Sequence, residues 1–100
     1  MTTYIQISDK TDEVKYKNPR SVLEYSVDWS AWLVDDVISS SDWEVPSGLT
    51  EASNEATDTV TTVWLSGGVD GRSYVIINHI ITAGGREEEA ILTVHVRDSS

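Results

Sequence analysis

The two histidines, His79 and His95, are the side chains of this 100-residue sequence that are best suited to chemistry. Neutral imidazole is a good metal ligand, and two imidazoles on adjacent strands can bind a metal ion together with a carboxylate. A histidine at an alternating position of a strand is, however, usually a half-buried surface residue. The sequence contains no cysteine, which excludes disulfides and thiolate ligands. We therefore expect neither a metal site nor a cofactor.

Carboxylates stand side by side at Asp35-Asp36 and at Glu87-Glu88-Glu89. Paired carboxylates can serve as general acid and base, but neighbours on a strand point to opposite faces and do not meet at one substrate. Solvated charge beside a hairpin is the better interpretation. The serines lie mostly in turns, without the neighbouring base that activates a nucleophile. The glycines of residues 67–71 lead into a strand, whereas a phosphate-binding loop leads into a helix. We therefore expect a protein that is not an enzyme.

The elements that would position these side chains are short β-rich runs bounded by turn residues. No segment has a convincing helical period, and no run is long enough to span a membrane. About seven such runs at regular spacing predict an all-β, antiparallel, immunoglobulin-like β-sandwich. Tyr74 agrees with this fold, because such sandwiches often begin a long strand with a tyrosine whose hydroxyl bonds to the preceding loop. The runs are residues 3–8, 22–34, 37–45, 49–54, 59–66, 74–82 and 89–96.

Several large side chains do not fit regular strands. Trp29 and Trp32 have opposite parity, so both reach the core only if a bulge or a half-turn intervenes. Ile38 and Trp43 likewise require a bend, or one of them faces outward. Trp64 has the opposite parity to the residues on either side of it, and only one of these sets can face inward. The predicted core consists of Tyr25, Val27, Trp29, Trp43, Leu65, Tyr74, Ile76, Ile80, Leu92 and Val94.

The formal net charge of −10 is unevenly distributed along the chain. Residues 1–20 hold four basic and three acidic residues (4 − 3 = +1), and residues 21–100 hold three and fourteen (3 − 14 = −11). This acid excess repels phosphate backbones, so we expect no nucleic-acid partner, and the short runs indicate no membrane partner. Residues 1–20 are charged and turn-prone. We predict that they form an N-terminal arm with one short strand, followed by the sandwich at residues 21–98.

The run from residue 74 to residue 82 places aliphatic side chains on both of its faces. If its even-numbered residues face the core, the odd-numbered aliphatics face outward, where a sandwich normally carries polar residues. Such a patch can contact another subunit. Alternatively, isoleucines of the N-terminal arm cover it within the same chain. The candidate interface residues are Val75, Ile77, Ile81 and Ile91, with Ile5 and Ile7 from the arm.

Five short motifs occur together between residues 20 and 97. They are Asp-Trp-Ser-x-Trp-Leu (28–33), Trp-x-Val-Pro-x-Gly-Leu (43–49), Trp-Leu-Ser-Gly-Gly (64–68), Gly-x-x-Tyr (71–74) and a Gly-Arg hairpin (85–86). As a set they resemble a family of small tailed-phage and prophage proteins described as fibre–tail adaptors. Residues 1–20 lie outside the family's pattern. The outward-facing side chains of the run 74–82 are more apolar than we expect for the family.

The resemblance implies a virion structural protein with an immunoglobulin-like sandwich, no catalytic residues and no cofactor. Its implied location is the virion tail, and the bacterial host cytoplasm during assembly. The implied partners are other virion proteins, and a homo-oligomeric ring is one form that such contacts take.

Two other functions stay open at this point. The −11 charge of residues 21–100 could mimic DNA and inhibit a host nucleic-acid-binding protein, which requires carboxylates in rows at phosphate spacing. A sugar-binding module of a fibre requires exposed aromatic side chains beside amides, whereas most tryptophans here occupy core-like positions. A map of the surface distinguishes these alternatives.

Overall fold

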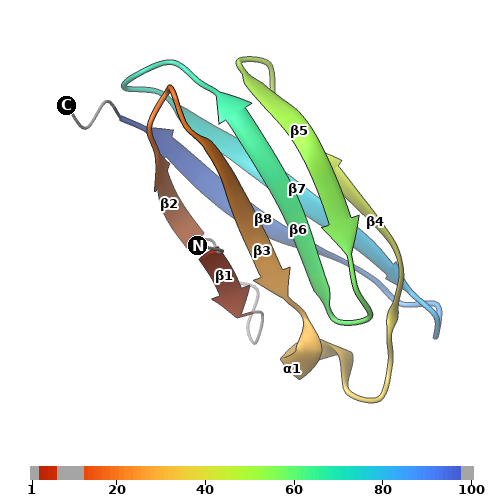
Figure 1. The fold of residues 1–100 in the computed structure, drawn as a ribbon. Coiled ribbons are helices and arrows are strands. Elements are labelled where there is room, and N and C mark those ends of the chain that lie inside the picture. Colours follow the sequence, from red (N-terminus) through yellow and green to blue (C-terminus); the bar gives the residue numbers. More distant parts are fainter. Residues whose placement is uncertain (1–2, 7–12, 98–100) are drawn as a thin grey trace.

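Alternating β-branched and aromatic residues form eight strands in the described part of the chain, and the strands build two four-stranded sheets packed face to face (Figure 1). The computed structural model describes the backbone of residues 3–6 and 13–97 and the side chains of residues 16–97. Sheet A has the strand order β1-β3-β6-β5, and sheet B has the order β2-β8-β7-β4. This arrangement confirms the predicted all-β, immunoglobulin-like sandwich. The elements are β1 (Thr3–Gln6), β2 (Glu13–Lys17), β3 (Val22–Asp28), α1 (Ser30–Leu33), β4 (Ile38–Glu44), β5 (Leu49–Ala56), β6 (Val60–Gly67), β7 (Ser73–Thr82) and β8 (Glu87–Val96).

Two strands come from residues 1–20, where the alternation of residues 3–8 predicts one. β1 pairs in parallel with β3 at the edge of sheet A, and β2 pairs in parallel with β8 at the edge of sheet B. The other strand pairs are antiparallel. The charged residues of β2 hide its strand character. The boundary at residue 20 between an arm and the sandwich stays a prediction.

Lys17, the last residue of β2, is buried although it carries a charge. Its side chain is 2% exposed, and its ammonium group donates hydrogen bonds to the carbonyls of Asn18 (2.9 Å) and Gly67 (2.7 Å). Burial lowers the pKa of Lys17, because the charged form loses its hydration. The two carbonyls replace part of that hydration, and the contact with Gly67 joins β2 of sheet B to the end of β6 in sheet A.

A single helical turn after Trp29 brings two tryptophans to the core. The N–H groups of Trp32 and Leu33 bond to the carbonyl of Trp29 at 3.0 and 2.9 Å. Trp29 is fully buried, and Trp32 packs against the core with its ring edge-on to that of Trp29 at 5.5 Å. The strand predicted through residue 34 therefore ends at Asp28. Of the two predicted alternatives, a bulge or a half-turn, the half-turn is correct.

No helix in the described residues is long and apolar enough to cross a membrane.

A bulge in β4 resolves the second parity conflict. The register with β7 shifts between Ile38 and Ser40, so Ile38 and Trp43 both pack against the core although their parities differ. Nine of the ten predicted core residues are buried, and Trp43, the tenth, is partly buried. Trp64 is only half-buried, because its neighbours in β6 take the inward positions. Five further residues of the core lie outside the predicted list, namely Leu33, Leu49, Val63, Ala90 and Val96.

Asn78 links the two sheets at the centre of the sandwich. It is fully buried, and its Oδ1 accepts hydrogen bonds from the indole Nε1 of Trp29 (3.1 Å) and the hydroxyl of Thr61 (2.6 Å). Its Nδ2 donates to Ser41 Oγ and to the carbonyl of Asp42, both at 3.0 Å. A buried amide with all of these bonds formed favours one register of the strands around it.

Tyr74 closes the loop between β6 and β7. Its hydroxyl accepts a hydrogen bond from the N–H of Val69 at 3.0 Å, as predicted for a tyrosine at this position. The ring packs against Gly48, where an added Cβ would lie 2.8 Å from a ring carbon and where φ is +107°. Both the space and the backbone angle therefore require glycine at residue 48.

Candidate interaction surface

The outer face of sheet B carries three of the candidate interface residues side by side. Val75 and Ile77 lie on β7, and Ile91 lies on β8 directly opposite Ile77. Val75 is 52% exposed, Ile91 is 38% exposed, and Ile77 is half-buried. We name these three residues the β7–β8 patch. They leave apolar area in solvent on a face where a sandwich usually carries polar side chains.

Ile81 lies on the same face but apart from the patch. His79 occupies the outward position between them, with Asp42 and Glu89 as its cross-strand neighbours. The His79 Nε2 atom lies 3.0 Å from Oε1 of Glu87, the residue that pairs with Ile81. The outer face of sheet B therefore changes from apolar at the patch to acidic around His79.

The two candidate residues of the N-terminal arm are not placed with the patch. Ile5 lies in β1, opposite Val27 at the edge of sheet A, whereas the patch belongs to sheet B. Ile7 lies outside the described residues. The structure thus brings together Val75, Ile77 and Ile91, and it leaves Ile5 in the other sheet.

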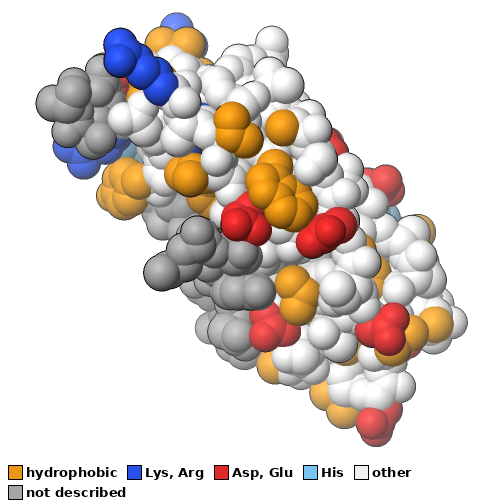
Figure 2. Space-filling view, in the orientation of Figure 1, with side chains coloured by type: hydrophobic (Ala, Val, Ile, Leu, Met, Phe, Trp, Pro, Cys, Tyr) orange, Lys and Arg blue, Asp and Glu red, His pale blue; other side chains and the backbone are white. Residues whose placement is uncertain are grey.

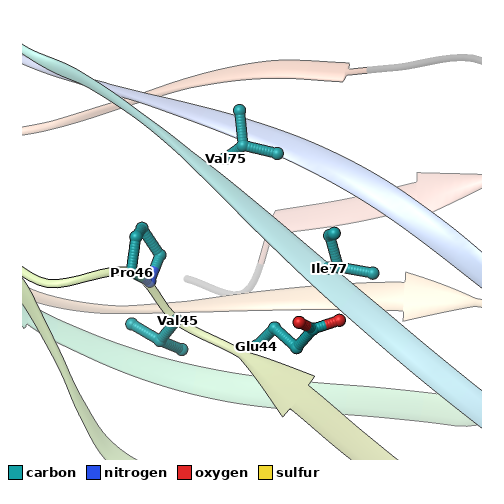
Figure 3. Close-up of a pocket in the computed structure, with 5 residues that line it drawn as sticks. All are labelled: Glu44, Val45, Pro46, Val75 and Ile77. Atoms are coloured by element: carbon teal, nitrogen blue, oxygen red, sulfur yellow. The ribbon is translucent and has the colours of Figure 1, made fainter.

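A groove lies beside the patch where β4 ends. After Glu44 the chain leaves β7 and passes through Val45 and Pro46 toward β5, while β7 continues (Figure 3). The groove has a volume of about 450 Å³, and its lining is aliphatic except for one carboxylate. Sequence periodicity identified two of the lining residues but missed those after β4, because it does not locate the end of a strand. The lining residues are Glu44, Val45, Pro46, Val75 and Ile77.

The two histidines lie far apart on sheet B. His79 faces Glu89, whereas His95 faces Ser73 and bonds to its hydroxyl at 2.7 Å. The six positions of β7 that separate Ser73 from His79 correspond to roughly 20 Å. In the described part of the chain, no three His, Cys, Asp or Glu side chains are grouped so that they could hold a metal ion.

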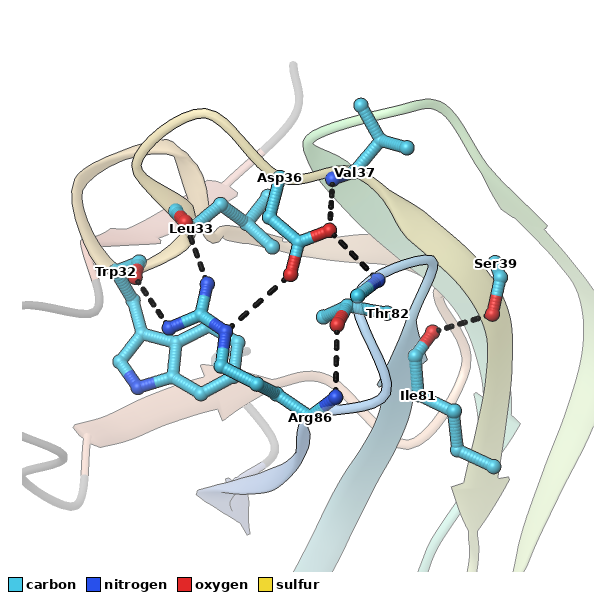
Figure 4. A network of polar contacts seen from close by, with 9 residues as sticks. Trp32, Leu33, Asp36, Val37, Ser39, Ile81, Thr82 and Arg86 are labelled. Atoms are coloured by element: carbon cyan, nitrogen blue, oxygen red, sulfur yellow. Dashed lines mark hydrogen bonds and ion pairs between the residues drawn. The ribbon is translucent and has the colours of Figure 1, made fainter.

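Arg86 makes a polar network at the other end of β4. Its guanidinium donates hydrogen bonds to the carbonyls of Leu33 (2.5 Å) and Trp32 (3.4 Å) and lies 4.2 Å from the centre of the Trp32 ring (Figure 4). Its Nε forms an ion pair with Asp36 at 3.3 Å. We name Arg86, Asp36 and Trp32 the Arg86 clamp. The clamp ties the β7–β8 hairpin to α1 and to the start of β4.

Asp36 is part of this network, which corrects the interpretation of Asp35-Asp36 as solvated charge. The Asp36 carboxylate accepts hydrogen bonds from the N–H groups of Val37 (2.9 Å) and Gly84 (3.0 Å). A hydrogen bond from the Thr82 hydroxyl, together with these two N–H groups and Arg86, lowers the pKa of Asp36 to about 2. These bonds outweigh the opposite effect of burial on the pKa. Asp36 therefore has a structural role.

The outer face of sheet A differs from the patch in character. Figure 2 shows this face, on which neutral side chains separate the described acidic side chains from one another. The face shown therefore lacks the rows of carboxylates that DNA mimicry requires. Trp64 is half-buried on this sheet, whereas Trp29 lies in the core and Trp32 and Trp43 pack against it. Few tryptophan rings are thus available for stacking on a sugar.

Comparisons with known proteins agree with this architecture. A family model described as "Podophage GP4 fiber-tail adaptor protein gp77" matches residues 17–95. Among solved structures, the chain is similar to the cysteine protease inhibitor EhICP2 from Entamoeba histolytica, with a TM-score of 0.60 and 8% identity over 96% of this chain and 95% of that chain. No curated protein sequence matches the chain.

Two further solved structures are similar. The PKD domain from KIAA 1837 protein has a TM-score of 0.54 and 22% identity, with 92% of this chain and 87% of that chain covered. The 2,6-sialyltransferase of Vibrionaceae Photobacterium sp. JT-ISH-224 has a TM-score of 0.59 and 13% identity, with 88% of this chain and 18% of that chain covered. At identities this low, the similarities concern the fold alone.

Proposed function

The chain belongs to the podophage GP4 fiber-tail adaptor family, and from this premise we propose that it is a non-catalytic structural protein that joins neighbouring proteins in a phage tail. The outer face of sheet B makes the contacts in this proposal. The chain would fold in the cytoplasm of the bacterial host and enter the tail during assembly.

The observation that supports this assignment of the surface is the β7–β8 patch. Fully burying an aliphatic side chain of this size contributes about 1.5–3 kcal/mol before the costs of association. Val75, Ile77 and Ile91 already lie on one face of two paired strands, so little backbone ordering is needed when a partner covers them. Repetition of a modest contact in a symmetric tail ring increases its total strength without new interactions.

The negative charge of this chain indicates which residues the partner surface carries. The chain has a net charge of −10, and carboxylates of Asp42, Glu87 and Glu89 surround His79 beside the patch. A partner surface with Lys or Arg next to an apolar centre complements this arrangement. The charged part accelerates and orients the encounter, whereas the apolar part supplies most of the affinity.

The first experiment is quantitative mass spectrometry of purified phage particles. The proposal predicts that this chain is recovered with the tail proteins in a fixed ratio, after washing at high salt removes loosely bound host protein. Recovery from the lysate but not from washed particles would contradict a role in the virion.

The second experiment removes apolar area from the patch. The double variant Ile77→Thr/Ile91→Thr keeps β propensity, and we expect it to fold normally but to be lost from particles. The matched control, Val22→Thr/Val69→Thr, replaces two exposed valines that lie outside the outer face of sheet B and should be incorporated like the wild type. Normal incorporation of the first variant would contradict the assignment of the surface.

A further inference from the structure

β7 is longer than the strand that pairs with its outer edge. The β4–β7 ladder ends where Glu44 pairs with Ile77, but β7 continues back to Ser73. Over the residues from Ser73 to Ile76, β7 is paired with β8 on one side, and β4 is absent from the other side. Sheet B therefore has an open edge beside its central strand, and not only at its outermost strands.

The direction of the β7 backbone groups follows from the bonds at its two ends. Val96 donates to the carbonyl of Arg72 at 2.9 Å, and Thr82 donates to the carbonyl of Arg86 at 2.8 Å. The even-numbered residues of β7 thus bond to β8, because hydrogen-bonded pairs alternate along an antiparallel ladder. The odd-numbered residues direct their N–H and C=O groups toward the β4 side. At Ser73 and Val75, these groups point to the open edge.

The chain's own next segment does not fill this edge. Pro46 would be the next residue opposite Val75 if β4 continued, but proline has no N–H to donate. Its carbonyl instead accepts a hydrogen bond from Leu49 at 3.3 Å, as the chain turns toward β5. In the described part of the chain, the main-chain N–H and C=O groups of Val75 have no hydrogen-bond partner.

The groove lies at this same position. Its aliphatic walls come from Val45, Pro46, Val75 and Ile77, and the exposed carboxylate of Glu44 stands at the end of β4 (Figure 3). Unpaired backbone groups beside an apolar groove are the features by which a sheet edge accepts an extended segment. The backbone bonds provide affinity, and alternate side chains of the segment enter the groove.

We propose that the open edge of β7 at Ser73–Ile76 binds an extended segment of a neighbouring virion protein by β-augmentation. The segment carries an aliphatic side chain that enters the groove and a Lys or Arg that pairs with Glu44. A second copy of this chain is the poorer occupant, because each copy has a net charge of −10. The inference rests on the proposed function for the identity of the neighbour, and it adds the backbone mode of recognition and the sequence pattern of the segment.

Two variants of one residue separate backbone pairing from side-chain contact. Val75→Pro removes the outward N–H, whereas Val75→Thr keeps it, and neither change removes the bonds of Tyr74 and Ile76 to β8. We expect the proline variant to be depleted from purified particles about tenfold relative to the threonine variant, with similar amounts in the soluble pool. Equal recovery of the two variants would overturn the proposal. Absence of the wild-type chain from particles would instead overturn the proposed function itself.

Amide hydrogen exchange of the wild-type chain tests the edge without any substitution. In the free protein, Ser73 and Val75 should exchange fast, while Tyr74 and Ile76 are protected by β8. In purified particles, exchange at Ser73 and Val75 should slow by about tenfold or more. Unchanged exchange there would overturn the proposal. The same protection in the concentrated free protein would assign the edge to a second copy and overturn the choice of partner.

Discussion

The contacts at the edge of sheet B differ between the two ends of β4. At its first end, the Arg86 clamp supplies donors to the carbonyls of Trp32 and Leu33, and Asp36 accepts four hydrogen bonds or ion-pair contacts. At its other end, the strand stops at Glu44, and beside an apolar groove the backbone groups of Val75 have no hydrogen-bond partner among the described residues. One end is closed by polar contacts within the chain, and the other is the edge at which we propose that a segment of another chain binds.

If the proposed contact surface is correct, stability and partner contact are carried by separate residues. The Asp-Trp-Ser-x-Trp-Leu and Gly-Arg motifs meet in the Arg86 clamp, where they hold the fold. The patch residues Val75, Ile77 and Ile91 lie outside the motifs, as expected if each adaptor contacts a different neighbour. The motif at residues 43–49 contributes both to the core and to the groove, since Trp43 packs against the core and Val45 and Pro46 line the groove.

The largest expected effect on stability concerns Asn78, which lies in β7 between the two ends. Asn78→Leu leaves the buried indole N–H of Trp29 with only its longer contact to Thr61 (3.2 Å) and removes the bonds to β4. We expect the free energy of unfolding to fall by about 3 kcal/mol, measured by urea denaturation. Ile80→Val is the control and should cost about 1 kcal/mol. A loss no larger than that of the control would show that the network around Asn78 does not hold the two sheets together.

The next largest expected effect on stability concerns the Arg86 clamp, which should matter for stability and not for incorporation into particles. Arg86→Ala removes the ion pair with Asp36, the bonds to two carbonyls and the contact with the Trp32 ring. The free energy of unfolding should fall by about 2 kcal/mol, while the folded variant still enters particles. Arg86→Lys keeps the charge but not the planar fork, and it should recover less than half of this loss. Loss of incorporation with unchanged stability would place Arg86 in an interface.

A smaller effect on stability should appear at acidic pH. The folded pKa of Asp36 is about 2, below its ordinary value of 3.8. Its contribution to stability is therefore complete above pH 3.8 and is lost as the pH falls toward 2. The melting temperatures of the wild type and Asp36→Asn, measured by circular dichroism, should differ at neutral pH and converge over this range. A constant difference between the two proteins across the range would contradict the role of the ionised carboxylate.

The smallest expected effect is at the open end. Val75→Thr replaces a side chain that is 52% exposed with another β-branched residue, so the free energy of unfolding should change by less than about 0.5 kcal/mol. Urea denaturation beside the wild type measures this change. A loss of more than about 1 kcal/mol would mean that the patch is covered within the same chain.

The sequence predicts the centre of the sandwich better than its ends. Alternation in β7 and β8 identified the inward residues, because a period of two relates each residue to one face. Trp29 and Trp32 indicated that a turn or bulge was needed, without distinguishing a helical turn from a bulge. β2 was missed because Lys17 buries its charged side chain against carbonyls of the chain.

The ends depend on contacts between residues far apart in the sequence. Arg86 and Leu33 are 53 positions apart, and neither residue alone indicates that a guanidinium will satisfy the carbonyls of α1. The groove likewise depends on the point at which β4 leaves β7, which is a tertiary property. The outward aliphatics Val75, Ile77 and Ile91 were nevertheless visible in the sequence, because their parity conflicts with a solvent-facing strand.

The most direct test of the central claim is a competition during assembly. Wild-type chain and Ile77→Thr/Ile91→Thr are produced together in equal amounts, and mass spectrometry gives their ratio in the soluble pool and in purified particles. If the outer face of sheet B is the contact surface, the variant should be depleted in particles by about tenfold relative to the soluble pool, because small losses of apolar area repeat around the tail. The same ratio in both fractions would contradict the claim that this face joins the chain to its neighbours.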